Sequence, residues 1–373
     1  MKLELRSVSG REELRTFIYL PKKIHRNDPH WLPPLWTDEW VLFDKAKNHA
    51  FEHADTVMLI AWRGKEAVGR IMGIISHRYN KINRENHGRF CFMECYNDRE
   101  VFSALINAVE EWARKKGMTA IVGPLGFSDK DPQGFQIEGF DVPSVMTSVS
   151  NLPYLPELLS ETGYVKKKDI LSFHAPIPRQ LPELYVKIFE RVAHRPDLKL
   201  IEFRSRKEIR PYIIDVLELM NETFAEIYGF VPLTDQEKME FANRYLPLLN
   251  PEFIKIVANS QGTLVGFAIG MPDLSSGIKR SGGYLYPFGL FFILWAATTS
   301  KTLLMMLGGV KAEYRGQGID TLMGAKILES AIRKKMTTLD SHLVLEENTR
   351  MRAEYERLGG KIVKRFRIFT KSL

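Results

Sequence analysis

Cysteine is scarce in this chain of 373 residues, which contains only Cys91 and Cys95. Two thiols four positions apart, with no second pair elsewhere, form neither a disulfide framework nor a zinc site. Residues 1–17 also lack the apolar core of a secretion signal. These absences predict a protein that holds no metal and works in the reducing cytoplasm.

Uninterrupted apolar runs of membrane-spanning length are missing as well. Residues 281–300 carry no charge, but Pro287 and Gly289 interrupt them, and a spanning helix needs about 20 apolar residues. We therefore expect a buried or surface-docking segment here. Two interpretations of residues 284–297 stay open: a core helix, or a surface that lines an acyl tunnel or lies peripherally on the inner membrane.

Acidic residues do not balance the basic ones, and the formal net charge is +8. A positive charge suits a nucleotide cofactor, a membrane surface or nucleic acid. The basic residues are spread out, with dense runs only at residues 166–168, 333–335 and 361–371, where solvated faces explain them. We expect an anionic cofactor and no nucleic acid.

The chain repeats itself at a nearly constant offset. The matching stretches are residues 56–75 with 252–271, and residues 154–164 with 352–360. Gly69 and Gly266 are 197 positions apart (266 minus 69), and Gly163 and Gly359 are 196 apart (359 minus 163). This agreement predicts an internal duplication.

Each half also contains an amphipathic helix followed by a strand. The helices are expected at residues 99–117 and 320–335, and the strands at 118–125 and 341–348. Residues 172–183, with three prolines, form the expected linker. We predict an α/β (α+β) fold of two lobes, residues 1–175 and 183–373, each with a mixed, mostly antiparallel sheet flanked by helices.

A glycine-rich loop at residues 315–320 follows an apolar strand, residues 302–310, and precedes a helix. Such a turn directs backbone N–H groups and the positive end of the helix dipole at a phosphate. Asp320 is a good N-cap residue but would repel a phosphate. Residues 92–102, at the same place in the first half, contain no glycine. Only the second half is therefore expected to bind phosphate, and a simple tight turn is the alternative.

This loop and the residues after it resemble the GCN5-related N-acetyltransferase (GNAT) superfamily. There an Arg/Gln-x-x-Gly-x-Gly/Ala loop binds the pyrophosphate of coenzyme A. Arg315 and Gly318 match that loop, and Asp320 departs from it. Asn348, Tyr355, Leu358 and Gly359 match a second motif of the superfamily. The resemblance implies a site for acetyl-CoA or acyl-CoA formed by Val310, Arg315, Gly316, Gln317, Gly318, Ile319, Asp320 and Asn348.

Four stretches of the first half resemble a narrower bacterial family of two-lobed acyltransferase-like proteins. They are residues 28–35, 68–80, 123–141 and 150–164. The family is often labelled after bacterial ceramide synthases, which attach a fatty acyl chain to a sphingoid amine. This resemblance implies acyl transfer from acyl-CoA to a primary amine. The polar residues in these motifs that could shape an acceptor site are Arg70, Asn80, Asp129, Asp131, Glu138 and Asn151.

The resemblance implies that Tyr355 is the general acid. A tyrosine, with a pKa near 10, keeps a proton at pH 7 that it can give to a thiolate. The same residue lies on an apolar helical stripe, so a core role is the alternative. For the base we favour Glu346, which strand alternation would place on one face with His342 and opposite Glu347. Asn348 either contacts the cofactor or caps the following helix.

Three functions stay open for this chain. The first is transfer of an acyl group to a lipid or sphingoid amine, and the second is acetylation of a small soluble amine. The third is a non-catalytic protein in which Asp320 blocks the cofactor. The acyl length, the acceptor and the oligomeric state are not predicted.

Overall fold

The computed structural model describes the backbone of residues 1–373 and all side chains except those of Ala193, Arg244, Tyr245 and Leu248. The strands of the first half are β1 (Leu3–Ser7), β2 (Ala54–Arg63), β3 (Glu66–Ser76), β4 (His87–Cys95), β5 (Ala120–Gly123), β6 (Phe135–Glu138) and β7 (Val165–Pro176). Its helices are α1 (Arg11–Ile24), α2 (Trp36–Leu42), η1 (His49–His53), α3 (His77–Asn83), α4 (Arg99–Lys115) and α5 (Tyr154–Glu161).

The second half repeats this order after an additional helix, α6 (Glu183–Ala193). Its strands are β8 (Leu198–Glu202), β9 (Ile254–Asn259), β10 (Leu264–Pro272), β11 (Thr302–Val310), β12 (Thr338–Asp340), β13 (Val344–Leu345) and β14 (Lys361–Ser372). The helices are α7 (Arg206–Ile209), η2 (Arg210–Tyr212), α8 (Ile213–Thr223), α9 (Asp235–Tyr245), η3 (Leu246–Leu248), η4 (Pro251–Phe253), α10 (Ser275–Ser281), α11 (Gly289–Thr299), η5 (Ala312–Tyr314), α12 (Ile319–Arg333) and α13 (Thr349–Arg357).

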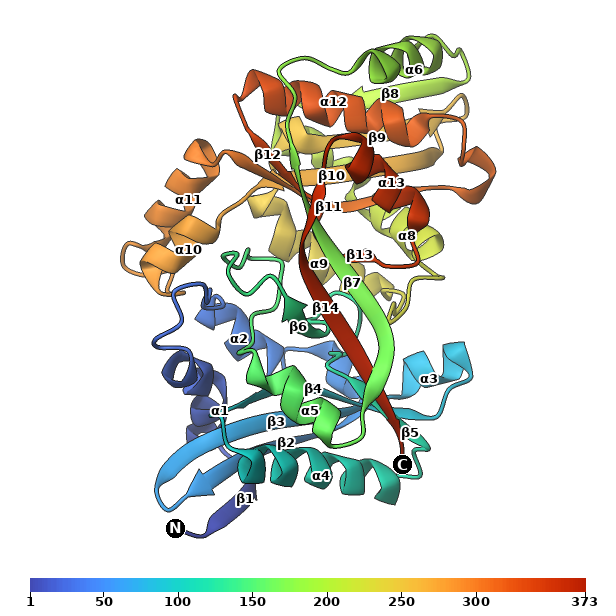
Figure 1. Ribbon diagram of the computed structural model, residues 1–373. Helices are drawn as coiled ribbons and strands as arrows, with labels where there is room; N and C mark the ends of the chain where they lie inside the picture. Colours follow the sequence, from blue (N-terminus) through green and yellow to red (C-terminus); the bar gives the residue numbers. More distant parts are fainter.

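All strands join one sheet, in the order β1-β2-β3-β4-β5-β14-β7-β12-β11-β10-β9-β8, with β6 and β13 beside it. The neighbours are antiparallel except β4 with β5 and β11 with β12. Helices flank this sheet, and the two halves lie at opposite ends of the molecule (Figure 1). The predicted α/β fold with a mixed, mostly antiparallel sheet is confirmed.

Each half gives its last strand to the other. The strand β7 pairs with β12 of the second half, and β14 pairs with β5 of the first. The two exchanged strands also pair with each other and cross the middle of the molecule (Figure 1). Their register joins Val165 to Thr370 and His174 to Lys361. The residue 196 positions after Val165 is Lys361, and the residue 196 positions after His174 is Thr370. The two pairs are therefore equivalent under the repeat, as expected of a contact between two equivalent halves.

Packing at two equivalent glycines supports the duplication. A Cβ atom at Gly69 would lie 2.7 Å from Leu105 of α4, and one at Gly266 would lie 3.0 Å from Ile319 of α12. In both halves, therefore, a glycine in the third strand lets the long helix approach the sheet closely. The core of the second half lies between α12 and the sheet, and that of the first half between α4 and the sheet.

One local prediction was wrong, and one of two open interpretations fails. The strand expected over residues 341–348 is interrupted, because the chain turns at His342, whose φ is 55°. Alternation therefore does not place His342 and Glu346 on one face. The core-helix interpretation of residues 284–297 also fails, because α11 buries only Gly289, Ile293 and Ala296. No helix among the described residues is long and apolar enough to cross a membrane.

Candidate active site

The strands β11 and β12 pair over only three residue pairs, the last of which is Leu304 with Asp340. Beyond Asp340 the chain turns at His342 and no longer pairs with β11. It continues as β13, which pairs with β7. The strand β11 continues along β10 as far as Val310. Its residues 305–310 are half-buried or exposed on the edge that β12 leaves. The two strands thus separate, and the open edge leads to the loop at residues 315–318.

The predicted loop has the geometry of an anion site. Gly316 and Gly318 have φ values of 77° and 84°, a region that favours glycine. The backbone N–H groups of residues 316–320 have no hydrogen-bond acceptor among the described residues. A Cβ atom on Gly316 would meet nothing within 4 Å, so the space above it is open. Gly316 is exposed and Ile319 is buried, and these unpaired donors lie at the N-terminus of α12, where the helix dipole favours an anion.

The carboxylate of Asp320 lies in an ion pair. Its Oδ2 is 2.6 Å from Nη2 of Arg350 at the start of α13. The N-cap residue of α12 is Gly318, and Oδ1 of Asp320 accepts from the N–H of Thr321 in the first turn of the helix at 3.0 Å. The positive charge of Arg350 compensates the carboxylate of Asp320, which alone would repel a phosphate at this loop. A second cation lies near, because Nη1 of Arg195 donates to Oε1 of Gln317 at 2.8 Å.

Two further predicted cofactor residues are anchored to the backbone. The Nε of Arg315 donates to the carbonyl oxygen of Val310 at 3.1 Å, and Arg315 is exposed. Asn348 is the N-cap of α13, and its Oδ1 accepts from the N–H of Met351 at 3.1 Å. The capping interpretation of Asn348 is thus observed, and its cofactor contact stays a prediction.

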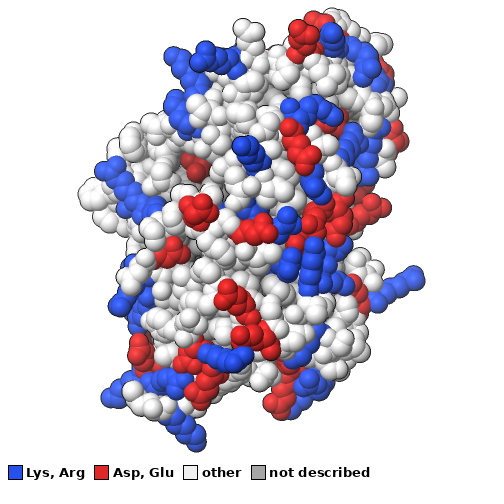
Figure 2. Space-filling model, viewed as in Figure 1, with Lys and Arg blue, Asp and Glu red and all other residues white. Residues whose placement is uncertain are grey.

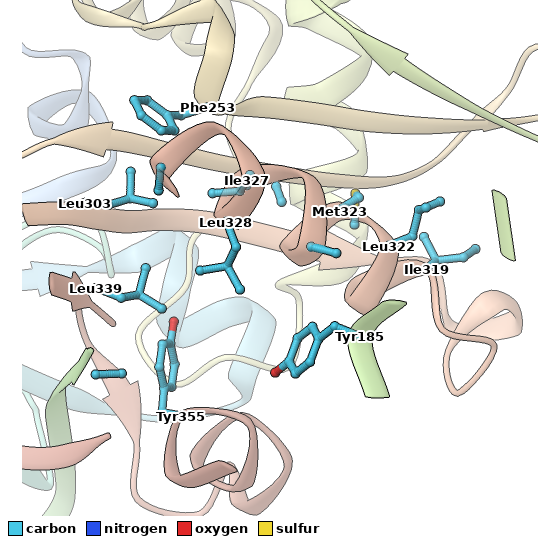
Figure 3. Close-up of a cluster of buried hydrophobic side chains, with 14 of the residues drawn as sticks. Tyr185, Phe253, Leu303, Ile319, Leu322, Met323, Ile327, Leu328, Leu339 and Tyr355 are labelled. Atoms are coloured by element: carbon cyan, nitrogen blue, oxygen red, sulfur yellow. The ribbon is translucent and has the colours of Figure 1, made fainter. Parts of the chain in front are cut away.

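Tyr355 lies inside the core of the second half. Its ring stacks on Phe173 of β7 with 5.7 Å between the ring centroids. In Figure 3 the ring points from α13 toward Leu328 of α12 and Leu339 of β12. Burial, followed by the charge of Asp340, raises the pKa of the phenol. Tyr355 therefore keeps its proton at neutral pH, which suits both a core residue and a general acid.

Glu346 is held by two cations. Its carboxylate lies 2.5 Å from Nζ of Lys166 and 2.7 Å from Nη1 of Arg365. The hydrogen bond from Lys166 is the largest cause that lowers the pKa of this carboxyl. A carboxylate in such a network is a weak base. The role of Glu346 as a base stays a prediction, and the geometry favours another residue.

A histidine and an aspartate meet where the strands separate. The Nε2 of His174 lies 2.9 Å from Oδ2 of Asp340, which is almost fully buried. His174 is partly exposed, and its Nδ1 has no partner among the described residues. If Nε2 carries the proton, Nδ1 presents a lone pair, which is the arrangement of an oriented general base. The sequence contains no local signal for this pair, because the partners are 166 positions apart.

Other buried polar groups lie near this pair. Burial lowers the pKa of Lys364 to about 8, against the attraction of Asp340 and two other carboxylates. Its Nζ donates to Ser144 at 3.3 Å. Burial also raises the pKa of Asp273, whose charge interacts with Asp340 and His174. The interior beside the His174–Asp340 pair is therefore polar and mixed in charge.

The first half carries different residues at the equivalent place, although β4 and β5 also pair over only three residue pairs. In the second half Asp340 pairs with His174, and the equivalent pair in the first half is Val122 with Thr370. Arg89, which lies opposite Val122 in the register of β4 and β5, is almost fully buried, and its Nη1 donates to the carbonyl of Gly126 at 2.9 Å. Its guanidinium lies 4.1 Å from the centroid of the Tyr79 ring. The first half thus lacks both the loop and the His–Asp pair.

The polar residues of the first-half motifs have local partners. They are Arg70 with the Phe17 carbonyl, Asn80 with the His87 carbonyl, Asp129 with Lys130, Asp131 with the Ser128 N–H, Glu138 with Arg365, and Asn151 with the Gln136 backbone. Most of these contacts hold backbone segments in place. A role in shaping an acceptor site stays a prediction for all six.

No family model matches the chain. It is 27% identical over 380 residues to Protein YghO of Escherichia coli strain K12, covering 99% of this chain and 95% of that protein. It is 26% identical over 368 residues to the bacterial ceramide synthase of Caulobacter vibrioides, covering 97% and 95%. A tandem GNAT protein from the clavulanic acid biosynthesis pathway superimposes with a TM-score of 0.58 at 15% identity, covering 100% and 98%. The resemblance predicted from the motifs is confirmed, and this chain has the fold of the tandem GNAT proteins.

Proposed function

We propose that this chain is an N-acyltransferase that moves an acyl group from acyl-CoA to a primary amine. The observation that carries the proposal is the separation of β11 from β12. At one end of the opening lies the loop with unpaired N–H groups, and at the other lies the His174–Asp340 pair. The likeness to the tandem GNAT fold and to a bacterial ceramide synthase supports the same function.

The donor would be held by the second half. The N–H groups of residues 316–320 suit the diphosphate, and Arg315 adds a charge-assisted bond. Arg195 and Arg350 lie next to the loop, paired with Asp197 and Asp320 respectively. The half-buried edge of β11 would bind the part of acyl-CoA that joins the diphosphate to the acyl group. The acyl group would then lie near Asp340.

The amine must lose a proton when it attacks the thioester, which supplies an activated acyl carbon. Nδ1 of His174 would accept that proton, while Asp340 fixes the ring and stabilises the imidazolium. Tyr355, protonated at neutral pH, would donate a proton to the leaving thiolate. The likeness to the Caulobacter protein favours a long-chain amine as acceptor. The scarcity of cysteine supports a cytoplasmic location.

Release of the CoA thiol tests this function. The full chain is mixed with acetyl-CoA or palmitoyl-CoA, and with a long-chain or a short soluble primary amine. We expect amine-dependent thiol release that is fastest with the long-chain pair. Preference for acetyl-CoA and the short amine would favour the soluble-amine alternative. Failure to bind either thioester in a calorimetric titration would leave the non-catalytic interpretation.

A further inference from the structure

Large apolar side chains are concentrated on one exposed segment between α10 and the end of α11. Of the 15 exposed large hydrophobic residues in the described chain, seven lie there, with 40% to 79% of their surface exposed. They are Tyr284, Tyr286, Phe288, Leu290, Phe291, Leu294 and Trp295. A soluble monomer rarely exposes so many together, so this patch indicates an interaction surface.

The patch is held on a compact hairpin. A Cβ atom on Gly277 of α10 would lie 2.5 Å from the carbonyl oxygen of Phe292 in α11, so the two helices touch through their backbones. Only Gly289, Ile293 and Ala296 of α11 are buried. A helix that is apolar on all faces is usually buried in a core or a membrane. The core of this protein covers one narrow side of α11 and leaves the rest open.

The segment of the chain that carries the patch has charges of one sign. No Asp or Glu occurs between Asp273 and Glu313, and the basic residues there are Lys279, Arg280, Lys301 and Lys311. The guanidinium of Arg280 lies 4.5 Å from the centroid of the Phe292 ring. In Figure 2 the hairpin is a mostly white projection at the left, with blue side chains along its lower side. Aromatic rings beside cations are typical of proteins at the membrane–water interface.

We propose that the hairpin formed by α10 and α11 docks into the headgroup region of an anionic lipid bilayer. The apolar side chains of α11 enter the interface, and the basic residues contact anionic headgroups. The hairpin also begins beside the candidate active site, because Ser275 of α10 hydrogen-bonds Asp273. Asp273 in turn donates its N–H to the carbonyl of Thr302 at 2.9 Å, in the part of β11 that pairs with the strand of Asp340. If the proposed function holds, on which this step rests, a hairpin in this position delivers a lipid amine from the bilayer to the His174–Asp340 pair.

Sedimentation with vesicles tests the docking without any acyl donor. The full chain is mixed with phosphatidylcholine vesicles, with or without about one-third phosphatidylglycerol. We expect binding to the anionic vesicles that weakens as salt rises, because exposed charges are screened. The triple variant Phe288→Ser, Phe291→Ser, Trp295→Ser should bind at least about 10-fold more weakly, since interfacial binding scales with buried apolar area. The double variant Arg280→Glu, Lys301→Glu should lose the preference for anionic vesicles.

A control uses exposed apolar residues elsewhere. The triple variant Ile82→Ser, Leu184→Ser, Met239→Ser should bind vesicles as the unaltered chain does. Unchanged melting temperatures would show that all variants fold. Equal binding by both triple variants, or no binding by the unaltered chain, overturns the proposal. A dimer that the α11 variant converts to a monomer, with no vesicle binding, identifies a second copy as the occupant instead. Vesicle binding without acyl transfer would refute only the proposed function.

Discussion

The imidazole of His174 and the carboxylate of Asp340 lie 2.9 Å apart, although the residues are separated by 166 positions in the chain. His174 belongs to β7 of the first half, and Asp340 belongs to β12 of the second. Their contact depends on the exchange of β7 into the second half of the sheet. The second half therefore completes its candidate site with a residue that the first half supplies.

Replacing His174 should remove the base. His174→Gln is expected to lower kcat by about 10² to 10³, within the range of general base catalysis. The KM for acyl-CoA should change little, because His174 lies away from the loop. Asp340→Asn should give a similar loss, since the ring would lose its orienting carboxylate. His77→Gln, an exposed histidine of the first half, serves as the control. Unaltered turnover in His174→Gln would contradict the assignment.

The loop can be tested with two variants of equal shape. Asn and Asp both tolerate the left-handed backbone of Gly316, and the space above this residue is open. Gly316→Asp should weaken acyl-CoA binding by about 10-fold more than Gly316→Asn, because only Asp repels the phosphates. Calorimetric titration at low and high salt measures the difference. Equal affinities would show that no anion lies at this loop. Gly318 is less suitable, because a Cβ atom there would lie 3.0 Å from Ile188 and Val192.

Two substitutions separate the roles of Tyr355. Tyr355→Phe keeps the ring that stacks on Phe173 and removes only the hydroxyl. We expect it to fold normally, to bind acyl-CoA and to lose turnover. Tyr355→Ala should cost about 3 to 5 kcal/mol of unfolding free energy, as large-to-small changes in a core do. If Tyr355→Phe lowers the melting temperature and leaves kcat intact, Tyr355 is a core residue only.

The buried His25 should make stability depend on pH. Burial alone would lower its pKa, but the Glu94 carboxylate, 3.0 Å from Nε2, and Asp28 raise it to about 9. The pKa is thus higher in the folded state than its ordinary value of 6.5, so this contribution is fully present below about pH 6.5. It is lost as the pH rises through 9, and amounts to at most about 3 kcal/mol.

Thermal melts of the unaltered chain and of His25→Gln between pH 6 and pH 10 measure this effect. The difference in unfolding free energy should be largest near pH 6 and should shrink by pH 10. His53→Gln, which removes an exposed histidine, should follow the unaltered chain. A difference that stays constant over this range would show that His25 does not titrate with folding.

Local pattern was enough for the parts of the fold that depend on neighbouring residues. The strand expected at residues 302–310 is β11, and the glycine loop precedes a helix that starts at Ile319. The repeat also followed from the sequence, because Gly69 and Gly266 have the same packing role. These features arise from periodicity and from turn residues, both of which can be seen in one segment at a time.

Features that depend on the strand exchange could not be predicted in this way. Nothing near His174 indicates Asp340 as its partner, and nothing near Glu346 indicates that Lys166 neutralises it. The exposure of α11 was left open by the sequence for a related reason. Its sequence is apolar on all faces, and composition cannot distinguish a core from a surface that meets another apolar phase.

The exchanged strands also set the order in which this protein can fold. Thr370 contacts Ile121 across 249 positions, so the first half cannot complete its sheet until the C-terminal strand has been made. Contacts this distant slow folding and leave β5 with an unpaired edge in the meantime. Once β7 and β14 have crossed, loss of either strand opens both halves. We therefore expect the two lobes, despite their duplicated plan, to unfold together in one transition.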